Sequence, residues 1–287
     1  YFCLAMMYSS SSIQELVRLL SLRLARTARQ SLAGLYASSF QGRGLEFAEL
    51  SEYQPGSDAR SIDWRATLRS GRTYSRRYQE DRELPLLLAC DCSASLFHQP
   101  QAWPLLCEAA GLFAYCAAWT QDPLGLLCFS DRLEQRLAPA RGLRQAGRVI
   151  AGLQELQPLG RRTDLAHVFT WLQNVQRRPA RIIVFSDLYA TGYQPALQRL
   201  ASRHEVIVAH IKVEPLASLP EGFWLAVQDA ESSQRSLCHT GSAGRATACQ
   251  AEDCCTAIRS CGAQYFTLTP VQTVLEAVRQ FLQGRLS

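Results

Sequence analysis

The chain has 287 residues, a length that suits one large domain or a domain with an appendage. Hydrophobic residues make up 47% and charged residues 19%, which excludes an intrinsically disordered chain and describes an ordinary globular protein. The net charge of +5 includes no block of basic residues, so the composition gives little support to nucleic-acid binding.

Cysteine usage and hydropathy favour a cytoplasmic protein. The chain contains 11 cysteines, an odd number without paired C-x-x-C motifs, which is typical of free thiols in a reducing compartment. The apolar start at residues 1–7 is too short for a signal peptide. The segment 103–119 carries a single charge but falls short of the roughly 20 residues that a membrane span requires. We therefore expect it to be a buried helix, and we expect no membrane span.

Residues 12–82 are predicted to form an N-terminal helix followed by a segment rich in mixed charges. A capping pattern at Ser12 and Glu15, followed by an apolar stripe, predicts a helix over 13–30. Between residues 40 and 82, charges of both signs alternate with aromatic residues, which indicates packed ion pairs. We expect Trp64 to bury its ring among them.

Residues 83–287 alternate between short apolar runs and segments of helical periodicity, as an α/β domain does. Right-handed crossovers then place helices on both faces of a mostly parallel, doubly wound sheet. The expected strands are 84–90, 125–129, 133–137, 181–186, 205–211 and 264–268. The expected helices are 103–120, 143–156, 164–176, 195–202, 246–260 and 271–283. A small β-rich appendage is expected at 223–240.

Polar side chains follow two of the buried strands. Asp91, Ser93 and Ser95 come directly after the first apolar run, and Asp187 closes the run that begins at residue 182. The carboxyl ends of parallel strands meet at the edge of a sheet where ligands bind. Thr163 lies just before a helix. Carboxylate and hydroxyl oxygens suit Mg²⁺ or Mn²⁺, although the short D-x-S-x-S motif is also compatible with a turn capped by an Asp.

These residues, in this order, resemble the metal-ion-dependent adhesion site of von Willebrand factor A domains. The resemblance implies that a divalent cation is held by Asp91, Ser93, Ser95, Thr163 and Asp187. It also implies that an acidic side chain of a protein partner fills the open coordination position. Arg161 and Arg162 would attract such a carboxylate, or they are exposed loop arginines without that role. The alternative for the whole set is an A-domain fold that has lost its ion.

A second, longer motif precedes the α/β part. It reads Gly42-x-Gly44-x-Glu46-Phe47, then Tyr53-x-Pro55-Gly56-x-Asp58-x-Arg60-x-Ile62-Asp63-Trp64. This motif resembles the signature of the DUF58 family, whose short soluble members end in a von Willebrand factor A-like domain. Ser57 departs from the family pattern, which usually has a second Asp there. The resemblance implies work beside a MoxR-type AAA+ ATPase in assembling or activating an unknown client protein.

The sequence thus predicts a cytoplasmic, non-enzymatic interaction module that docks a protein partner through a bound Mg²⁺ or Mn²⁺. No phosphate loop, nucleophile elbow or plausible Ser-His-Asp arrangement accompanies the predicted metal ligands. The competing interpretation is a protein that binds nucleic acid or an anionic surface through the arginines of residues 18–82. Steep salt dependence of binding would favour that interpretation.

Overall fold

The computed structural model describes residues 32–40, 47–52, 64, 67–68, 73–78, 84–160, 162–213, 224–228, 235–239 and 254–286. The helix expected over 13–30 and most of the motif between Gly42 and Trp64 lie outside these residues. The boundary predicted between residues 82 and 83 stays a prediction.

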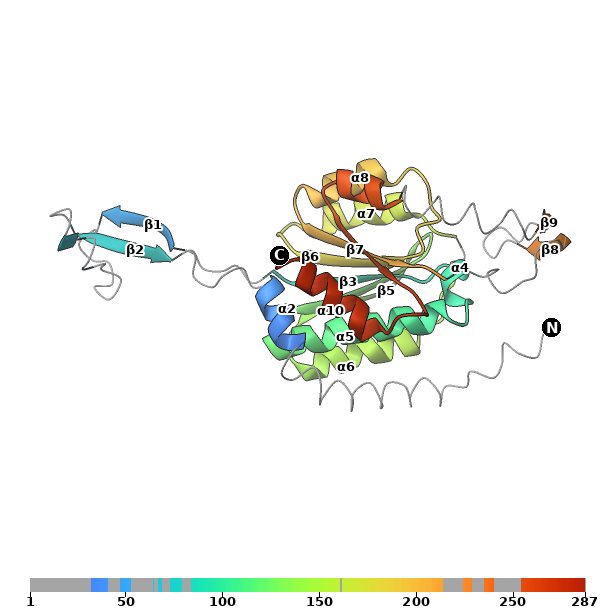
Figure 1. Cartoon of the computed structure of the whole chain (residues 1–287), viewed down its shortest axis with the longest axis horizontal. Helices are drawn as coiled ribbons and strands as arrows, with labels where there is room; N and C mark the ends of the chain where they lie inside the picture. Colours follow the sequence, from blue (N-terminus) through green and yellow to red (C-terminus); the bar gives the residue numbers. More distant parts are fainter. Residues whose placement is uncertain are drawn as a thin grey trace.

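A six-stranded sheet in the order β10-β7-β6-β3-β4-β5 forms the centre of the molecule (Figure 1). Its strands are β3 (Leu86–Asp91), β4 (Leu124–Phe129), β5 (Leu133–Ala140), β6 (Arg181–Ser186), β7 (Glu205–Ile211) and β10 (Gln264–Leu268). Neighbouring strands are parallel except β5, which runs antiparallel to β4. All six predicted strands are present. β3, β4, β6 and β7 are the buried inner strands, as their continuous apolar runs predict, whereas β5 and β10 are partly exposed edge strands.

Helices cover both faces of the sheet, which confirms the predicted doubly wound α/β class. The helices are α2 (Ala33–Phe40), α4 (Ala94–Phe97), α5 (Ala102–Thr120), α6 (Leu143–Gln154), α7 (Leu165–Val175), α8 (Gln194–Ala201), α10 (Val274–Gly284) and a helix over 254–260. The core on one face includes α2, α5, α6 and α10, and the core on the other includes α7, α8 and the 254–260 helix.

The apolar segment 103–119 lies within α5, a 19-residue helix of the core. Most of its side chains are buried, and it packs against α6, α10 and the sheet. Among the helices that the structure describes, none combines the length and the apolar character that crossing a membrane demands.

Two short antiparallel hairpins lie outside this sheet. β8 (Trp224–Gln228) pairs with β9 (Arg235–His239), as expected for the β-rich appendage at 223–240. β1 (Phe47–Glu52) pairs with β2 (Tyr74–Tyr78), a hairpin that the sequence analysis did not predict.

The expectation that Trp64 buries its ring is wrong, because 65% of this residue is exposed. The aromatic residues that the N-terminal part contributes to the core are Tyr36 and Phe40 of α2 instead. They occupy the buried face of a short helix, whose other positions are exposed or partly exposed.

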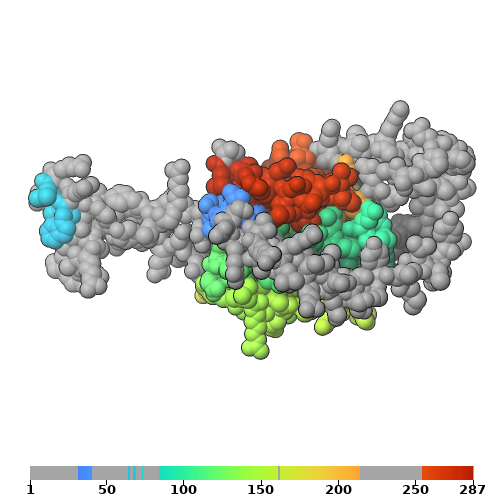
Figure 2. All heavy atoms as spheres, turned by 60° about the horizontal axis from the view of Figure 1, so that its bottom comes forward, coloured from blue at the N-terminus to red at the C-terminus, as the bar shows by residue number. Residues whose placement is uncertain are grey.

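Helix α2 is held at the edge of the sheet where β6 and β7 begin, and Figure 2 shows it beside α10. Arg181 Nη2 donates to the carbonyl oxygen of Phe40 (2.8 Å), and its guanidinium lies 4.0 Å from the centre of the Phe40 ring. The guanidinium of Arg285 approaches the same ring at 4.5 Å. Glu205 forms ion pairs with both arginines. The Phe40 ring and the ion pairs of Glu205 therefore together join α2, β6, β7 and the end of α10.

Replacing Phe40 with Ala should lower the free energy of unfolding by about 3–5 kcal/mol, because the core loses a buried aromatic ring. The two cation–π contacts are lost with it. Urea denaturation of the full chain measures the effect. Ser38→Ala, on the exposed side of the same helix, is the matched control and should change stability by less than about 0.5 kcal/mol. Equal stability of the two variants would show that α2 does not depend on this contact.

Candidate functional site at the carboxyl ends of β3 and β6

Asp91 is the last residue of β3, and its side chain is completely buried in the middle of the sheet. The chain turns directly after it, and the backbone N–H of Ser93 donates to Asp91 Oδ1 (2.9 Å). Ser93 is the N-cap residue of α4, the short helix that leads away from the sheet. The D-x-S-x-S motif is therefore the connection between a buried strand and a helix, at the edge predicted from the sequence.

The end of β6 brings a second carboxylate to the same place. Ser95 Oγ donates to Asp187 Oδ2 (2.7 Å), and Ser95 Oγ lies 3.1 Å from Ser93 Oγ. Ser186 Oγ donates to Asp91 Oδ2 (2.7 Å). The side chains of Asp91, Ser93, Ser95 and Asp187, which the sequence analysis selected, thus lie in one hydrogen-bonded cluster. Their oxygens are the hard donors that Mg²⁺ and Mn²⁺ prefer.

The backbone after β6 holds Asp187 in this position. Leu188 has a φ of 59°, an uncommon conformation for a bulky residue, and its side chain is buried. Its N–H donates to Ser186 Oγ (3.1 Å), and the N–H of Tyr189 donates to Asp187 Oδ1 (3.3 Å). The tight turn directs the carboxylate of Asp187 back over the end of the sheet, while the ring of Tyr189 is half exposed.

Thr163 is half-buried in the loop that precedes α7. The next residue, Asp164, caps α7 by accepting from the N–H of His167 (2.8 Å), and its own N–H donates to the Ser130 carbonyl oxygen (3.4 Å). Ser130 follows β4, the neighbour of β3, so the loop lies along the same edge of the sheet as Asp91. Arg162 is exposed, and Arg161 lies outside the described residues.

Glu134 holds the start of this loop. Its carboxylate accepts from Ser130 Oγ (2.6 Å), the Leu159 N–H (3.0 Å) and the Gly160 N–H (2.7 Å). Partial burial opposes ionisation, but these hydrogen bonds outweigh it and lower the pKa of Glu134. A Cβ at Gly160 would overlap the side-chain oxygens of Ser130 and Asp131, so a larger residue there would force these side chains to move. The sequence analysis missed Glu134, since nothing in a lone acidic residue on an edge strand indicates this contact.

The carboxylates of Asp91 and Asp187 lie close enough to repel each other. Burial, and then the negative charge of Asp187, raise the pKa of Asp91 to about 7, against the hydrogen bonds from Ser93 and Ser186. The cluster therefore favours a cation or a proton at its centre. Within the described ranges, no group of three or more His, Cys, Asp or Glu side chains has metal-binding geometry, and this cluster relies on hydroxyls instead.

Ser186 and His210 also belong to this edge, and neither is predicted from the sequence as a site residue. Ser186 precedes Asp187 and pairs in register with His210 of β7, so both lie at the same edge. His210 forms a hydrogen bond with the Asp187 backbone, and its Nδ1 lies 2.7 Å from the Tyr265 hydroxyl. Burial lowers the pKa of His210 to about 4, so the ring is neutral at pH 7. Their position at strand ends was the only available signal.

The fold is that of a doubly wound α/β protein with a polar cluster at the carboxyl ends of its strands. Sequence comparison gives the family. The chain belongs to the family described as protein of unknown function DUF58, whose model matches residues 49–252. A Mycobacterium tuberculosis (strain H37Rv) protein, described as uncharacterized, is 30% identical over 279 residues, 91% of this chain and 87% of the relative. A Mycobacterium avium protein, also described as uncharacterized, is 29% identical over 134 residues, 45% of this chain and 79% of the relative.

Comparison with solved structures finds similar chains of low sequence identity. The crystal structure of the conserved hypothetical protein BatB from Bacteroides thetaiotaomicron is 13% identical, with a TM-score of 0.46 over 71% of this chain and 98% of that chain. A von Willebrand factor type A structure from Catenulispora acidiphila is 10% identical, with a TM-score of 0.43 over 75% of this chain and 44% of that chain.

Replacing Ser186 with Ala removes a hydrogen bond to the buried Asp91 carboxylate and should destabilise the metal-free protein. We expect a loss of about 1.5–3 kcal/mol at pH 8, where Asp91 is ionised, and about 0.5–1.5 kcal/mol at pH 5, where it is protonated. Urea denaturation in EDTA at both pH values measures this. Ser202→Ala is the control, because Ser202 is an exposed serine at the end of α8 and should show no such pH dependence.

Proposed function

We propose that this protein is a non-enzymatic interaction module that binds a protein partner through a divalent cation, Mg²⁺ or Mn²⁺. The observation that carries the proposal is the single hydrogen-bonded cluster of Asp91, Ser93, Ser95 and Asp187 at the ends of two adjacent parallel strands. Thr163 is the fifth proposed ligand, on a loop anchored beside the same edge.

The five proposed ligands are of two chemical kinds. Asp91 and Asp187 supply the negative charge, and Ser93, Ser95 and Thr163 supply neutral hydroxyls. A divalent ion balanced by two carboxylates leaves the site close to neutral, so an incoming carboxylate is not repelled. The electrostatic state of Asp91 supports this arrangement, because a cation between the carboxylates would offset the repulsion that raises its pKa.

The proposed partner side chain is an acidic residue that completes the coordination of the ion. Arg162 is exposed next to Thr163, and we assign it, together with Arg161, a role in attracting that carboxylate. From the family resemblance we further propose that the protein works in the cytoplasm beside a MoxR-type AAA+ ATPase, in assembling or activating a client protein. ATP would then be hydrolysed by the ATPase and not by this chain, whose sequence contains no phosphate loop.

Titration calorimetry tests the ion directly. The full chain should bind Mg²⁺ or Mn²⁺, and Asp91→Asn, which keeps the shape of the side chain but removes its charge, should abolish binding. Glu155→Gln, an exposed neutral substitution beyond the end of α6, is the matched control and should bind as the wild type does. Equal affinity in Asp91→Asn and the wild type would refute the site.

The stability of the protein should respond to pH and to the ion together. The pKa of Asp91 is about 7 in the folded protein and roughly 3.9 in an unfolded chain. The folded state therefore holds this proton more tightly, and in EDTA the Asp91 contribution to stability should decline as the pH rises from about 4 to about 7. Saturating Mg²⁺ should reverse the decline, with the largest stabilisation above pH 7. Thermal melts across this range would contradict the proposal if Mg²⁺ stabilised equally at every pH.

Partner capture separates this function from the alternative of an anionic-surface binder. Thr163→Ala should fold normally but lose the partners that the wild type retains in Mg²⁺ and releases in EDTA. Quantitative mass spectrometry of the retained proteins should show a MoxR-type ATPase in the Mg²⁺-dependent set. The nucleic-acid interpretation would instead be favoured by affinity for generic DNA that falls steeply as the salt concentration rises and does not change on addition of EDTA. ATP hydrolysis by the pure chain, abolished in Asp91→Asn, would overturn the non-enzymatic assignment.

A further inference from the structure

The edge strand β10 presents hydrogen-bonding groups that no described strand uses. It is the last strand of the sheet, and its five residues pair with β7 in an uninterrupted parallel register. The Leu268 carbonyl oxygen accepts from the N–H of Lys212 (2.9 Å), so the backbone groups of Leu268 face β7. Because backbone groups alternate in direction along a strand, those of Tyr265 and Thr267 face outward, away from the sheet.

The opposite edge of the same sheet is protected against further pairing. β5 contains Pro139 and an exposed Arg136, and its register with β4 shifts at two places. Proline, exposed charge and register irregularities are the usual devices that prevent an edge from adding a strand. β10, with the sequence Gln-Tyr-Phe-Thr-Leu, has none of them.

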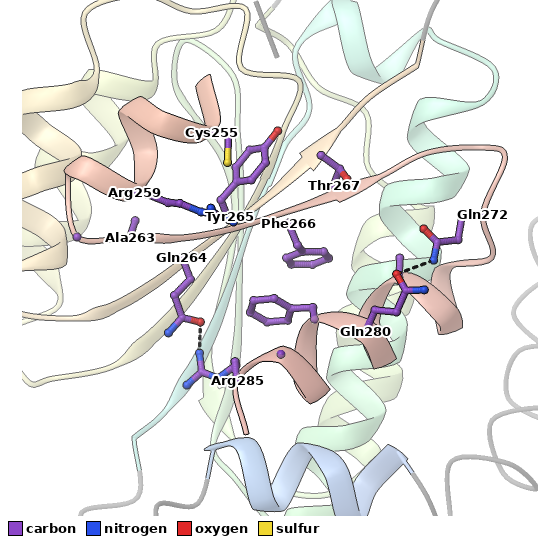
Figure 3. Close-up of a pocket in the computed structure, with 14 residues that line it drawn as sticks. Cys255, Arg259, Ala263, Gln264, Tyr265, Phe266, Thr267, Gln272, Gln280 and Arg285 are labelled. Carbon is purple, nitrogen blue, oxygen red and sulfur yellow. Dashed lines mark hydrogen bonds between the residues drawn. The ribbon is translucent and has the colours of Figure 1, made fainter. Parts of the chain in front are cut away.

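The outer side of β10 lies in a groove of about 760 Å³, here called the β10 groove (Figure 3). The 254–260 helix, carrying Cys255 and Arg259, borders it on one side of the strand, and α10 borders it on the other. Phe266 stacks on Phe281 of α10 with ring centres 4.5 Å apart, which gives the groove an aromatic wall. A groove with side-chain walls, beside a strand edge that no other described strand occupies, suits an extended peptide.

The charged side chains that line the β10 groove are all positive. Among the described residues that line it, none is acidic, and the charged ones are Arg259 and Arg285. Arg285 is already engaged with Glu205 and Gln264. Arg259 is exposed, and its guanidinium has no ion pair or hydrogen bond with any other described residue. Within the part of the chain that the structure describes, no acidic side chain competes with an incoming carboxylate for this guanidinium.

From these features we propose that the β10 groove binds an extended, acidic peptide segment of a partner protein, which adds to the sheet as a strand beside β10. Its backbone would pair with the outward-facing groups of Tyr265 and Thr267, and an Asp or Glu side chain would meet Arg259. A second copy of this chain is disfavoured as the occupant, since two like-charged grooves would face each other across a symmetric edge contact. The site is separate from the proposed metal site and does not depend on it.

The test is selection from a displayed library of random peptides, each about six residues long, the usual length of a strand. The full chain is the bait, and EDTA is present throughout to silence the proposed metal site. Selected peptides should alternate apolar or β-branched residues with Asp or Glu. On binding of a synthetic copy, the backbone amides of Tyr265 and Thr267 should become protected from hydrogen exchange, which only strand addition predicts.

Two variants with one control make the assignment specific. Arg259→Glu should weaken binding of the selected peptide roughly tenfold or more, because it replaces a charge-assisted contact with repulsion. Thr267→Pro removes an outward-facing N–H without touching the bonds to β7, and should weaken binding by a similar factor. Arg279→Glu carries the same charge change on the exposed side of α10, outside the groove, and should leave affinity within about twofold. If Thr267→Pro fails to fold, the affinity of Arg259→Glu and the hydrogen-exchange measurement still test whether the peptide binds beside β10.

Several results would overturn the proposal. These are a selection without enrichment, enriched peptides without acidic residues, or equal losses in Arg259→Glu and Arg279→Glu. A concentration-dependent dimer that Thr267→Pro abolishes would assign the edge to a second copy instead. Because every measurement is made in EDTA, Asp91→Asn should bind the selected peptide as the wild type does, and a failure of the metal site leaves this result unaffected.

Discussion

The burial of Asp91 at the end of the central strand is the constraint on which the candidate site depends. A carboxylate with no exposed surface must be satisfied by neighbours, and here those neighbours are the Ser93 backbone and the Ser186 hydroxyl. The Ser93 contact belongs to the turn directly after β3, whereas the Ser186 contact arises because β3 and β6 are adjacent parallel strands that end together. The second carboxylate, Asp187, reaches the cluster for the same reason. Moving either strand by one residue would point these groups to the other face of the sheet.

The remaining parts of the molecule hold that edge in place. Glu134 fixes the loop before Thr163 through its bonds to Leu159 and Gly160, so an edge strand positions a residue of a distant loop. At the amino ends of β6 and β7, the helix α2 is attached by a cluster of four residues. They are Phe40, Arg181, Glu205 and Arg285. One end of the sheet thus carries charges that are already paired with one another, whereas the other end brings the carboxylates of Asp91 and Asp187 together.

His210 and Tyr265 join the two proposed binding regions. His210 contacts the backbone of Asp187 on one side and the Tyr265 hydroxyl on the other, and Tyr265 lines the β10 groove. The imidazole is neutral because burial lowers its pKa to about 4, so the link is made of hydrogen bonds and not of charge. The cluster at β3 and β6 and the groove at β10 therefore lie at neighbouring positions across a single strand, β7.

The sequence by itself determined the α/β class, the strands and most helices, because continuous apolar runs and helical periodicity reflect burial that any such sheet imposes. It also indicated that Asp91, Ser93, Ser95 and Asp187 would meet at one edge, since parallel strands end on the same side. Only the tertiary structure decided the contacts that depend on side chains from distant elements. These include Ser186 on Asp91, Glu134 on the Gly160 loop, the placement of Phe40 between two arginines, and the exposure of Trp64. Such contacts follow from the packing of elements that are far apart in the chain, and no local pattern encodes them.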